Sequence, residues 1–159
     1  MAILITLSLL LCSSQPSQVG WRGIIPLHST RADVERLLGP GTDGCKCGYY
    51  LSDVNLSVVY SSFNCENCIC STSSGENVWN VPNDTVLRIV VYPKIKQKFS
   101  SLDIDKTKFK ETHDGHLAQI VSYVNGDQGL TIEVNQDLDL VMGFYYGPAT
   151  EDQHLRCSK

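Results

Sequence analysis

Cysteines are the residues of this sequence with the widest range of chemistry, because a thiolate can ligate a metal, exchange electrons or form a disulfide bond. The stretch FNCENCIC holds three of them within six positions, and the stretch GCKCG holds two more. Together with one near the C-terminus, the cysteines that follow residue 20 are Cys45, Cys47, Cys65, Cys68, Cys70 and Cys157. Three interpretations compete for them: a metal site, a redox centre, or a set of disulfide bonds.

The spacing of these cysteines favours disulfide bonds. A zinc site usually takes two C-x₂₋₄-C pairs; Cys65 and Cys68 form one, but Cys45 and Cys47 are too close for the common geometry. A redox C-x-x-C pair normally opens a helix, whereas CENC lies in a polar loop without helical periodicity. A disulfide bond needs only an oxidising compartment. The metal and redox interpretations stay open as alternatives.

The N-terminus predicts that the chain is exported. Residues 3–11 are mostly apolar, too few to span a bilayer but typical of the central region of a signal peptide. We therefore predict a signal peptide over residues 1–20 and a single domain over residues 21–159, located in the periplasm or outside the cell. Lipidation at Cys12 is a less favoured alternative, because Leu11 precedes it where a lipoprotein signal has a small residue. The six remaining cysteines would then form three disulfide bonds of unknown connectivity.

Size and charge narrow the functional classes. About 140 residues suffice for one domain with a real core. The formal net charge is −4, and no strongly basic region suggests nucleic acid as a partner. No second hydrophobic segment follows the predicted signal peptide, so we expect no transmembrane span in the mature chain.

One helix is predicted early in the chain. Thr30 is a suitable N-cap with Asp33 as its reciprocal partner, and Gly39 followed by Pro40 would end the helix. Val34, Leu37 and Leu38 would form its apolar stripe.

The rest of the chain alternates with period two, which is typical of strands. About six strands are expected, one each in 54–62, 84–93 and 107–113 and three in 119–148, with turns at 125–129 and 135–137. Residues predicted to share one face within each strand are Val54, Leu56, Val58 and Tyr60; Thr85, Leu87, Ile89 and Val91; Leu130, Ile132 and Val134; and Leu138, Leu140, Met142, Phe144 and Tyr146. In the second of these strands, Val86, Val90 and Tyr92 make the opposite face nearly as apolar. The predicted fold is α+β: an antiparallel sheet with one short N-terminal helix packed on it, stapled by disulfide bonds.

Two stretches carry a resemblance. LHSTRADVERLLGPG resembles the helix of SmpA/OmlA-like and β-lactamase-inhibitor-like bacterial envelope domains, through Thr30, Arg31, Asp33, Val34, Leu37, Leu38 and Gly39. The longer pattern of GWRGIIPLHSTRADVERLLG, CKC, WNVPNDTVLRIVVYPK, GFYYGP and HLRC resembles a group of uncharacterised exported bacterial proteins. The resemblance implies export and binding to other proteins without catalysis. A network of six cysteines departs from the usual envelope domains.

Other candidate chemistry is weaker. His113, Asp114 and His116, with His28 or His154, are ligand types for zinc, but a turn such as HDGH does not align them, and we expect unrelated exposed histidines. We predict no catalytic residue, no metal site and no cofactor. Lys94, Lys96 and Lys98 share one side of an extended segment. They form either a basic patch for an anionic glycan, a lipid head group or an acidic partner, or guards of an edge strand.

The sequence therefore predicts an exported domain without catalytic activity that binds another envelope or secreted protein. Its binding surface would use Trp79, Tyr145, Tyr146 and the three lysines. Two alternatives are an exported hydrolase or metalloenzyme that uses the histidines, and a thiol- or metal-handling protein that uses the cysteines between Cys45 and Cys70. The oligomeric state is left open.

Overall fold

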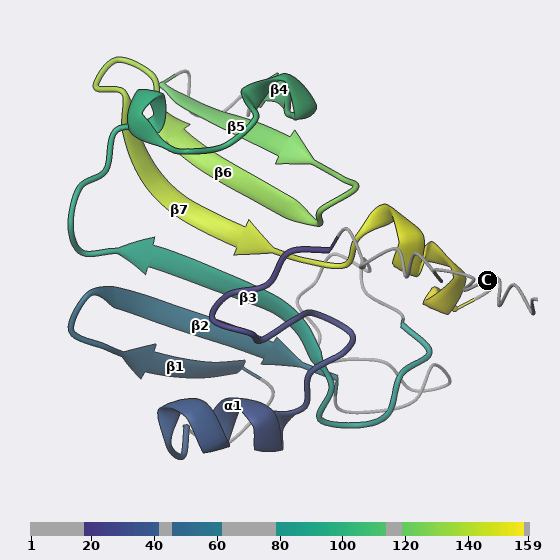
Figure 1. Cartoon of the computed structure of the whole chain (residues 1–159). Coiled ribbons are helices and arrows are strands. Elements are labelled where there is room, and N and C mark those ends of the chain that lie inside the picture. The colour runs from purple at the N-terminus through teal and green to yellow at the C-terminus, as the bar shows by residue number, and fades with distance from the viewer. Residues whose placement is uncertain (1–17, 42–45, 62–78, 114–118, 158–159) are drawn as a thin grey trace, which may run out of the picture.

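The computed structural model describes residues 18–41, 46–61, 79–113 and 119–157 (Figure 1). The α-helix in this part of the chain is α1 (Arg31–Leu38). The strands are β1 (Lys46–Tyr50), β2 (Val54–Tyr60), β3 (Val86–Pro93), β4 (Lys110–His113), β5 (Ile120–Asn125), β6 (Leu130–Asn135) and β7 (Leu140–Tyr146). Short 3-10 helices are η2 (Phe99–Ser101), η3 (Lys106–Lys108) and η4 (Thr150–Leu155). None of the helices in the described residues has the length and hydrophobicity needed to span a membrane.

The strands form one antiparallel sheet in the order β1-β2-β3-β7-β6-β5-β4. Strands β1 to β3 are consecutive neighbours, as are β4 to β7, and the two halves meet where β3 pairs with β7. This pairing joins segments that are about 50 positions apart in the sequence, with Val91 opposite Phe144. The α+β class and the antiparallel sheet are as predicted.

The sheet has seven strands rather than about six, and β1 is the strand that the sequence did not indicate. Its sequence, KCGYY, is short and contains Gly48, a poor strand former, so its periodicity is weak. Pairing with β2 compensates: Cys47 lies opposite Val58 and Tyr49 lies opposite Leu56, and all four side chains are buried. Tertiary packing therefore decides this strand, which local propensity alone does not predict.

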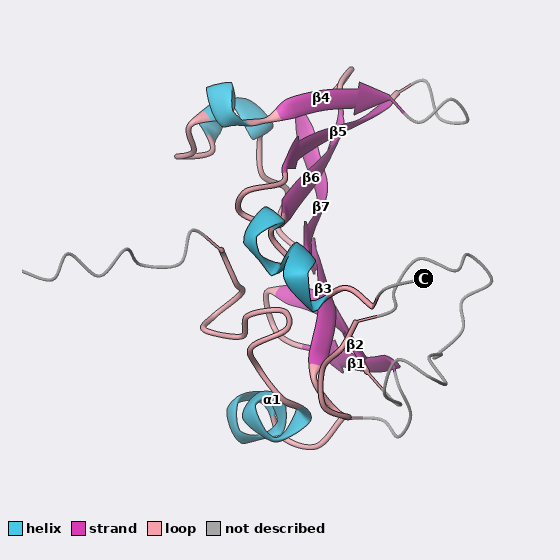
Figure 2. Ribbon diagram, turned by 90° about the vertical axis from the view of Figure 1, so that its right-hand side faces the viewer, coloured by secondary structure: helices cyan, strands magenta, loops and turns pink. Residues whose placement is uncertain are grey.

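The helices lie on one side of the sheet when it is viewed edge-on (Figure 2). On that side, Val34 of α1 packs into a cluster formed mainly by β1, β2 and β3. Phe99 of η2 packs into a second cluster formed mainly by β6 and β7. Phe144 and Tyr146 of β7 contact both clusters, so one continuous core runs along the covered face of the sheet.

Strands β2 and β6 present the faces that their alternation predicts. The β2 residues Val54, Leu56, Val58 and Tyr60 are all buried, and so are Leu130, Ile132 and Val134 of β6. Their side chains line the side of the sheet that the helices cover. The alternation predicts the buried face correctly here because the extra residue of each β-bulge lies in the partner strand and not in β2 or β6.

Irregular pairing changes the predicted faces of β3 and β7. Between β2 and β3 the register shifts, and Val86 joins Ile89 and Val91 in the core instead of lying on the opposite face. In β7 a second shift, opposite Glu133 and Val134, turns Val141 into the core and leaves Met142 exposed. A β-bulge reverses the alternation beyond it, and the sequence alone gives no sign of its position.

Helix α1 begins with the predicted capping box. Thr30 Oγ1 accepts a hydrogen bond from the Asp33 backbone, and the Asp33 carboxylate accepts one from the Thr30 backbone N–H at 2.9 Å. The helix ends before Gly39, whose φ of 83° lies in the left-handed region. Val34 is buried, but Leu37 is 50 % exposed, so the predicted apolar stripe is narrower than expected. An eight-residue helix makes only about two turns and buries little surface.

We expect Thr30→Ala to lower the free energy of unfolding by about 1 kcal/mol at neutral pH, because it removes the N-cap side chain. Hydrogen bonds from Thr30 hold the pKa of the Asp33 carboxyl below its usual 3.8. The charged cap therefore stabilises the fold at neutral pH, and its contribution is lost as the pH falls through this lowered pKa. Urea denaturation at pH 7 and in acid should show a difference that narrows in acid; equal stability at pH 7 would argue against the cap.

Candidate binding surface

Large exposed hydrophobic side chains gather at one end of the sheet. Tyr50 is 84 % exposed, Ile95 is 70 % exposed and Leu138 is 61 % exposed, and Tyr92 and Met142 are each nearly half exposed. Among the described residues, only Leu37 is a large exposed hydrophobic elsewhere. We define the strand-end surface as these five side chains and the exposed lysines beside them: Tyr50, Tyr92, Ile95, Leu138, Met142, Lys94, Lys96 and Lys98.

Strand register brings the tyrosines together. Tyr50 of β1 lies opposite Asn55 of β2, and Asn55 lies opposite Tyr92 of β3. The three residues form one row across the sheet, and partners in such a row point to the same face. On the other side of Tyr92, Gly143 has no side chain, and this leaves room for the Tyr92 ring. A Cβ at Gly143 would lie 3.4 Å from that ring.

The loop after β3 is held on both sides. The Lys94 backbone N–H donates to the Asp53 carbonyl at 2.9 Å, and Lys94 Nζ donates to the Leu51 carbonyl. Farther along, the Val141 N–H donates to the Gln97 carbonyl at 2.9 Å. These bonds join residues 94–98 to the β1–β2 turn and to the start of β7. Ile95 therefore lies on a loop that is held between the β1–β2 turn and the start of β7.

Tyr145 fixes the centre of this part of the sheet. Its hydroxyl donates to Glu133 Oε2 at 2.6 Å, and its ring meets the Tyr92 ring edge to face with 6.3 Å between centroids. Burial raises the pKa of the Tyr145 hydroxyl, and the neighbouring Glu133 carboxylate raises it further. Tyr145 is therefore neutral at physiological pH and holds Tyr92 in place as a rigid aromatic contact.

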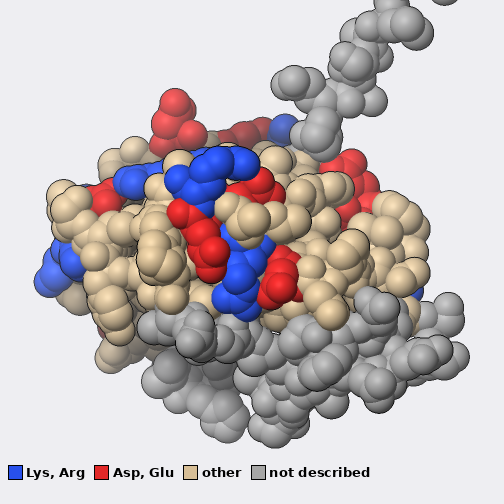
Figure 3. Space-filling view, turned by 90° about the horizontal axis from the view of Figure 1, so that it is seen from below, with Lys and Arg blue, Asp and Glu red and all other residues tan. Residues whose placement is uncertain are grey.

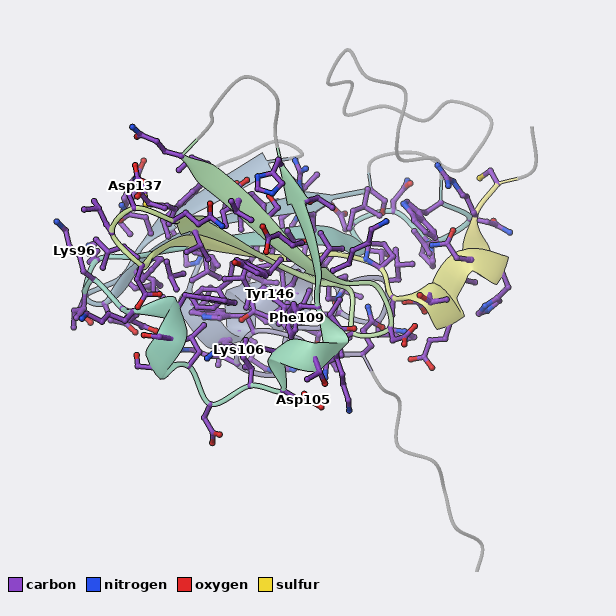
Figure 4. All side chains as sticks on the ribbon, turned by 90° about the horizontal axis from the view of Figure 1, so that it is seen from above. Lys96, Asp105, Lys106, Phe109, Asp137 and Tyr146 are labelled. Atoms are coloured by element: carbon purple, nitrogen blue, oxygen red, sulfur yellow. The ribbon has the colours of Figure 1, made fainter. Side chains whose placement is uncertain are left out.

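Charges of both signs border the strand-end surface, where three lysines lie near acidic groups such as Asp139, whose carboxyl pKa is lowered by hydrogen bonds from Ser100 and also by Lys98. Lys94, Lys96 and Lys98 are all exposed. Asp137 lies at the same end of the sheet as Lys96 (Figure 4). Three ammonium groups around exposed apolar side chains match the usual arrangement of a binding surface with an apolar centre and a polar rim.

The three aromatic residues predicted for binding differ in their exposure and position in the structure. Tyr145 belongs to the sheet beneath the strand-end surface, but Trp79 is 6 % exposed and packs with Leu27 and Val81. Tyr146 is half-buried and packs into the core. Trp79 and Tyr146 are therefore not part of an exposed surface. Sequence reasoning missed Tyr50, Tyr92, Leu138 and Met142, because strand order brings them together; only Ile95, an apolar residue between two lysines, was a local signal.

The histidines that the structure describes are His28, His113 and His154. Each has its own polar partner: His28 Nε2 with Asp152 at 3.1 Å, His113 Nε2 with Glu111 at 3.0 Å, and His154 Nδ1 with the Glu151 carbonyl at 2.7 Å. Asp114 and His116 lie outside the described residues. Within the part of the chain that is described, no three His, Cys, Asp or Glu side chains gather closely enough to hold a metal.

Most of the predicted cysteine network lies outside the described residues, as do Cys12 and residues 1–17 of the predicted signal peptide. Cys47 is buried, and its sulfur accepts a hydrogen bond from Arg31 Nη1 at 3.1 Å. Cys157 is disulfide-bonded. Because Cys45, Cys65, Cys68 and Cys70 are not described, the pairing of the six cysteines and the metal and redox alternatives stay predictions.

Comparison with known proteins gives no relative: no family model matches the chain, and no match occurs among the curated proteins or the solved structures.

Proposed function

We propose that this protein is an exported domain without catalytic activity that binds another exported or envelope protein through the strand-end surface. The observation that carries this proposal is the gathering of Tyr50, Tyr92, Ile95, Leu138 and Met142 at one end of the sheet, beside three lysines. Soluble proteins rarely expose large contiguous apolar patches, and such patches with a polar rim mark interaction sites.

The residue types suit a protein partner. Tyrosine is enriched among the residues that dominate binding energy, and methionine adapts its shape to a partner. Burying apolar surface contributes roughly 25 cal/mol per Å² before the costs of association are subtracted. Lysines at the rim attract an acidic partner and reject a basic one. We therefore propose a partner that presents apolar side chains surrounded by Asp or Glu.

Export and disulfide bonds belong to the same proposal. Their support is the apolar stretch at residues 3–11, which is followed by an even number of cysteines. In an oxidising compartment these cysteines would staple the α+β domain and keep its binding surface in place during exposure outside the cytosol.

Photo-crosslinking in the native host tests the proposal. A photoreactive amino acid replaces Tyr50 in one variant and Gln153, an exposed residue of η4, in a matched control. We expect a single dominant adduct with an exported protein from position 50 and none from position 153. Adducts of equal yield from both positions, or none from position 50, would exclude the strand-end surface as the docking site.

We expect the double variant Lys96→Gln/Lys98→Gln to slow association with the crosslinked partner roughly three- to tenfold at low salt, because rim charges act mainly on the association rate. The control Lys108→Gln/Lys110→Gln removes the same charge from η3 and β4, away from the strand-end surface. Stopped-flow or biosensor kinetics at low and high salt measure the effect. If both variants slow association equally, net charge rather than the strand-end surface governs binding.

A further inference from the structure

A second feature is a pocket of about 460 Å³ between the turn at residues 21–25 and helix α1. Its lining includes Arg22 and His28 from the chain before α1, and Asp33, Arg36 and Leu37 from α1. Basic and acidic side chains lie next to one another on the side of the molecule where α1 lies (Figure 3). The pocket is thus distinct from the strand-end surface, to which none of these residues belongs.

A tight turn presents Arg22 at the pocket. Trp21 and Ile24 exchange backbone hydrogen bonds of 3.0 and 2.9 Å across it. Arg22 has a φ of 50° in the left-handed region, which a non-glycine residue rarely adopts, and the turn holds it there. Its guanidinium lies 4.6 Å from the centre of the Trp21 ring and donates to Asp53 at 2.6 Å. Only Nη2 makes that bond, and a guanidinium has five N–H donors.

Helix α1 supplies a second guanidinium. Arg36 donates to Asp33 at 2.9 Å, but its side chain is 79 % exposed, and an exposed ion pair of this kind contributes little to stability. Asp33 also accepts hydrogen bonds from Thr30. If Arg36 turned towards a ligand, the Asp33 carboxylate would therefore keep its capping partners. This makes Arg36 available at low cost.

His28 is held in place by a buried carboxylate. Asp152 is 2 % exposed and accepts from the Ala149 N–H at 3.1 Å, and its other oxygen lies 3.1 Å from His28 Nε2. The ring is thereby fixed by η4, a segment more than 120 positions away in the sequence, at the wall of the pocket.

Apart from Gly23 and Ser29, the remaining lining is apolar. Ile24 and Ile25 contribute to the pocket from the turn, and Leu37 contributes from α1. Leu37 is the one large exposed hydrophobic of the described residues that lies outside the strand-end surface. Its position at the pocket accounts for the exposure that the helix pattern did not predict.

We propose that this pocket binds a small amphipathic carboxylate, with its carboxylate between Arg22 and Arg36 and its apolar body on Ile25 and Leu37. Each guanidinium already pairs with one carboxylate, Arg22 with Asp53 and Arg36 with Asp33, so the carboxylate of a ligand would bind the remaining N–H donors of the two arginines. A planar guanidinium pairs with a carboxylate through two parallel hydrogen bonds. A free short-chain acid and a peptide C-terminus share this chemistry.

NMR titration of the full mature chain with hexanoate, N-acetyl-leucine and N-acetyl-leucine amide tests the proposal. We expect millimolar binding of a carboxylate, as befits ligands of so few atoms, with shifts concentrated at residues 22–25 and 36–37. Binding of hexanoate alone identifies a free acid as the ligand class, and binding of N-acetyl-leucine alone identifies a peptide C-terminus. The neutral amide should not bind.

Variants of exposed residues make the test specific. Arg36 is well exposed, so Arg36→Gln should leave the fold intact and no charge buried without a partner. The loss of its guanidinium should weaken carboxylate binding at least about tenfold. The matched control is Arg88→Gln. Arg88 is an exposed residue of β3, and this variant should bind the carboxylate as tightly as the wild type does. Equal binding by R36Q and R88Q, equal binding of the amide, or the lack of localised shifts with either carboxylate would overturn the proposal.

Discussion

Gly129→Ala is expected to lower the free energy of unfolding by about 2–5 kcal/mol, from a left-handed backbone penalty and the displacement of packed backbone. Gly129 ends the β5–β6 turn with a φ of 63°. A Cβ there would clash with the Gly147 carbonyl and lie 3.0 Å from the Pro148 carbonyl carbon. The Gly147 N–H also donates to the Gly129 carbonyl at 2.7 Å, so neither segment moves freely.

The matched control is Gly23→Ala. Gly23 has a φ of 83°, but nothing lies within 4 Å of the position of its Cβ. Only the backbone penalty of about 1–2 kcal/mol should appear there. Chemical denaturation of both variants separates the backbone penalty, which both share, from the steric clash, which only Gly129→Ala introduces. Equal losses in the two variants would mean that residues 147–148, which follow β7, do not approach the β5–β6 turn as closely as described.

Ile132→Ala is expected to lower the free energy of unfolding by about 2–5 kcal/mol. Ile132 is fully buried in β6, at the centre of the cluster that joins the sheet to η2. Removing its side chain leaves a cavity, because Phe99 and Val134 are fixed by their own elements. A loss of this size is a large part of the typical total of about 5–15 kcal/mol for a domain.

Leu138→Ala is the control for Ile132→Ala. Leu138 lies in the turn between β6 and β7, and its side chain is 61 % exposed. Like Ile132→Ala, this variant shortens an aliphatic side chain to alanine. The free energy of unfolding should stay within about 0.5 kcal/mol of the wild-type value, because exposed positions contribute little to folding. Equal losses in the two variants, measured by urea denaturation, would mean that the assigned core and surface are wrong.

Local patterns explain how much of the fold is readable from the sequence. Val54 to Tyr60 alternates without interruption, and Thr30 with Asp33 marks the start of α1, so both features are predicted correctly. Met142 and Val86 are misplaced because register shifts reverse the alternation near them. A shift of this kind depends on the partner strand, and sequence periodicity within one strand carries no information about it.

The candidate sites depend still more on tertiary structure. Lys94, Lys96 and Lys98 are visible in the sequence as a group. Tyr50 joins them only through the pairing of β1 with β2 and of β2 with β3, and Met142 joins them only because β7 pairs with β3. The pocket beside α1 likewise needs the turn at Arg22, whose left-handed φ no motif signals. Residues far apart in the sequence meet by strand order, which a single sequence does not specify.

The most direct test of the central claim is the dissociation constant between the partner captured at position 50 and the variant Tyr50→Ser/Ile95→Ser. Both side chains are well exposed, so the variant should unfold at the same temperature as the wild type. If the strand-end surface is the docking site, loss of two central apolar contacts should raise Kd about 100-fold or more. A Kd within twofold of the wild-type value, with the fold intact, would contradict the account.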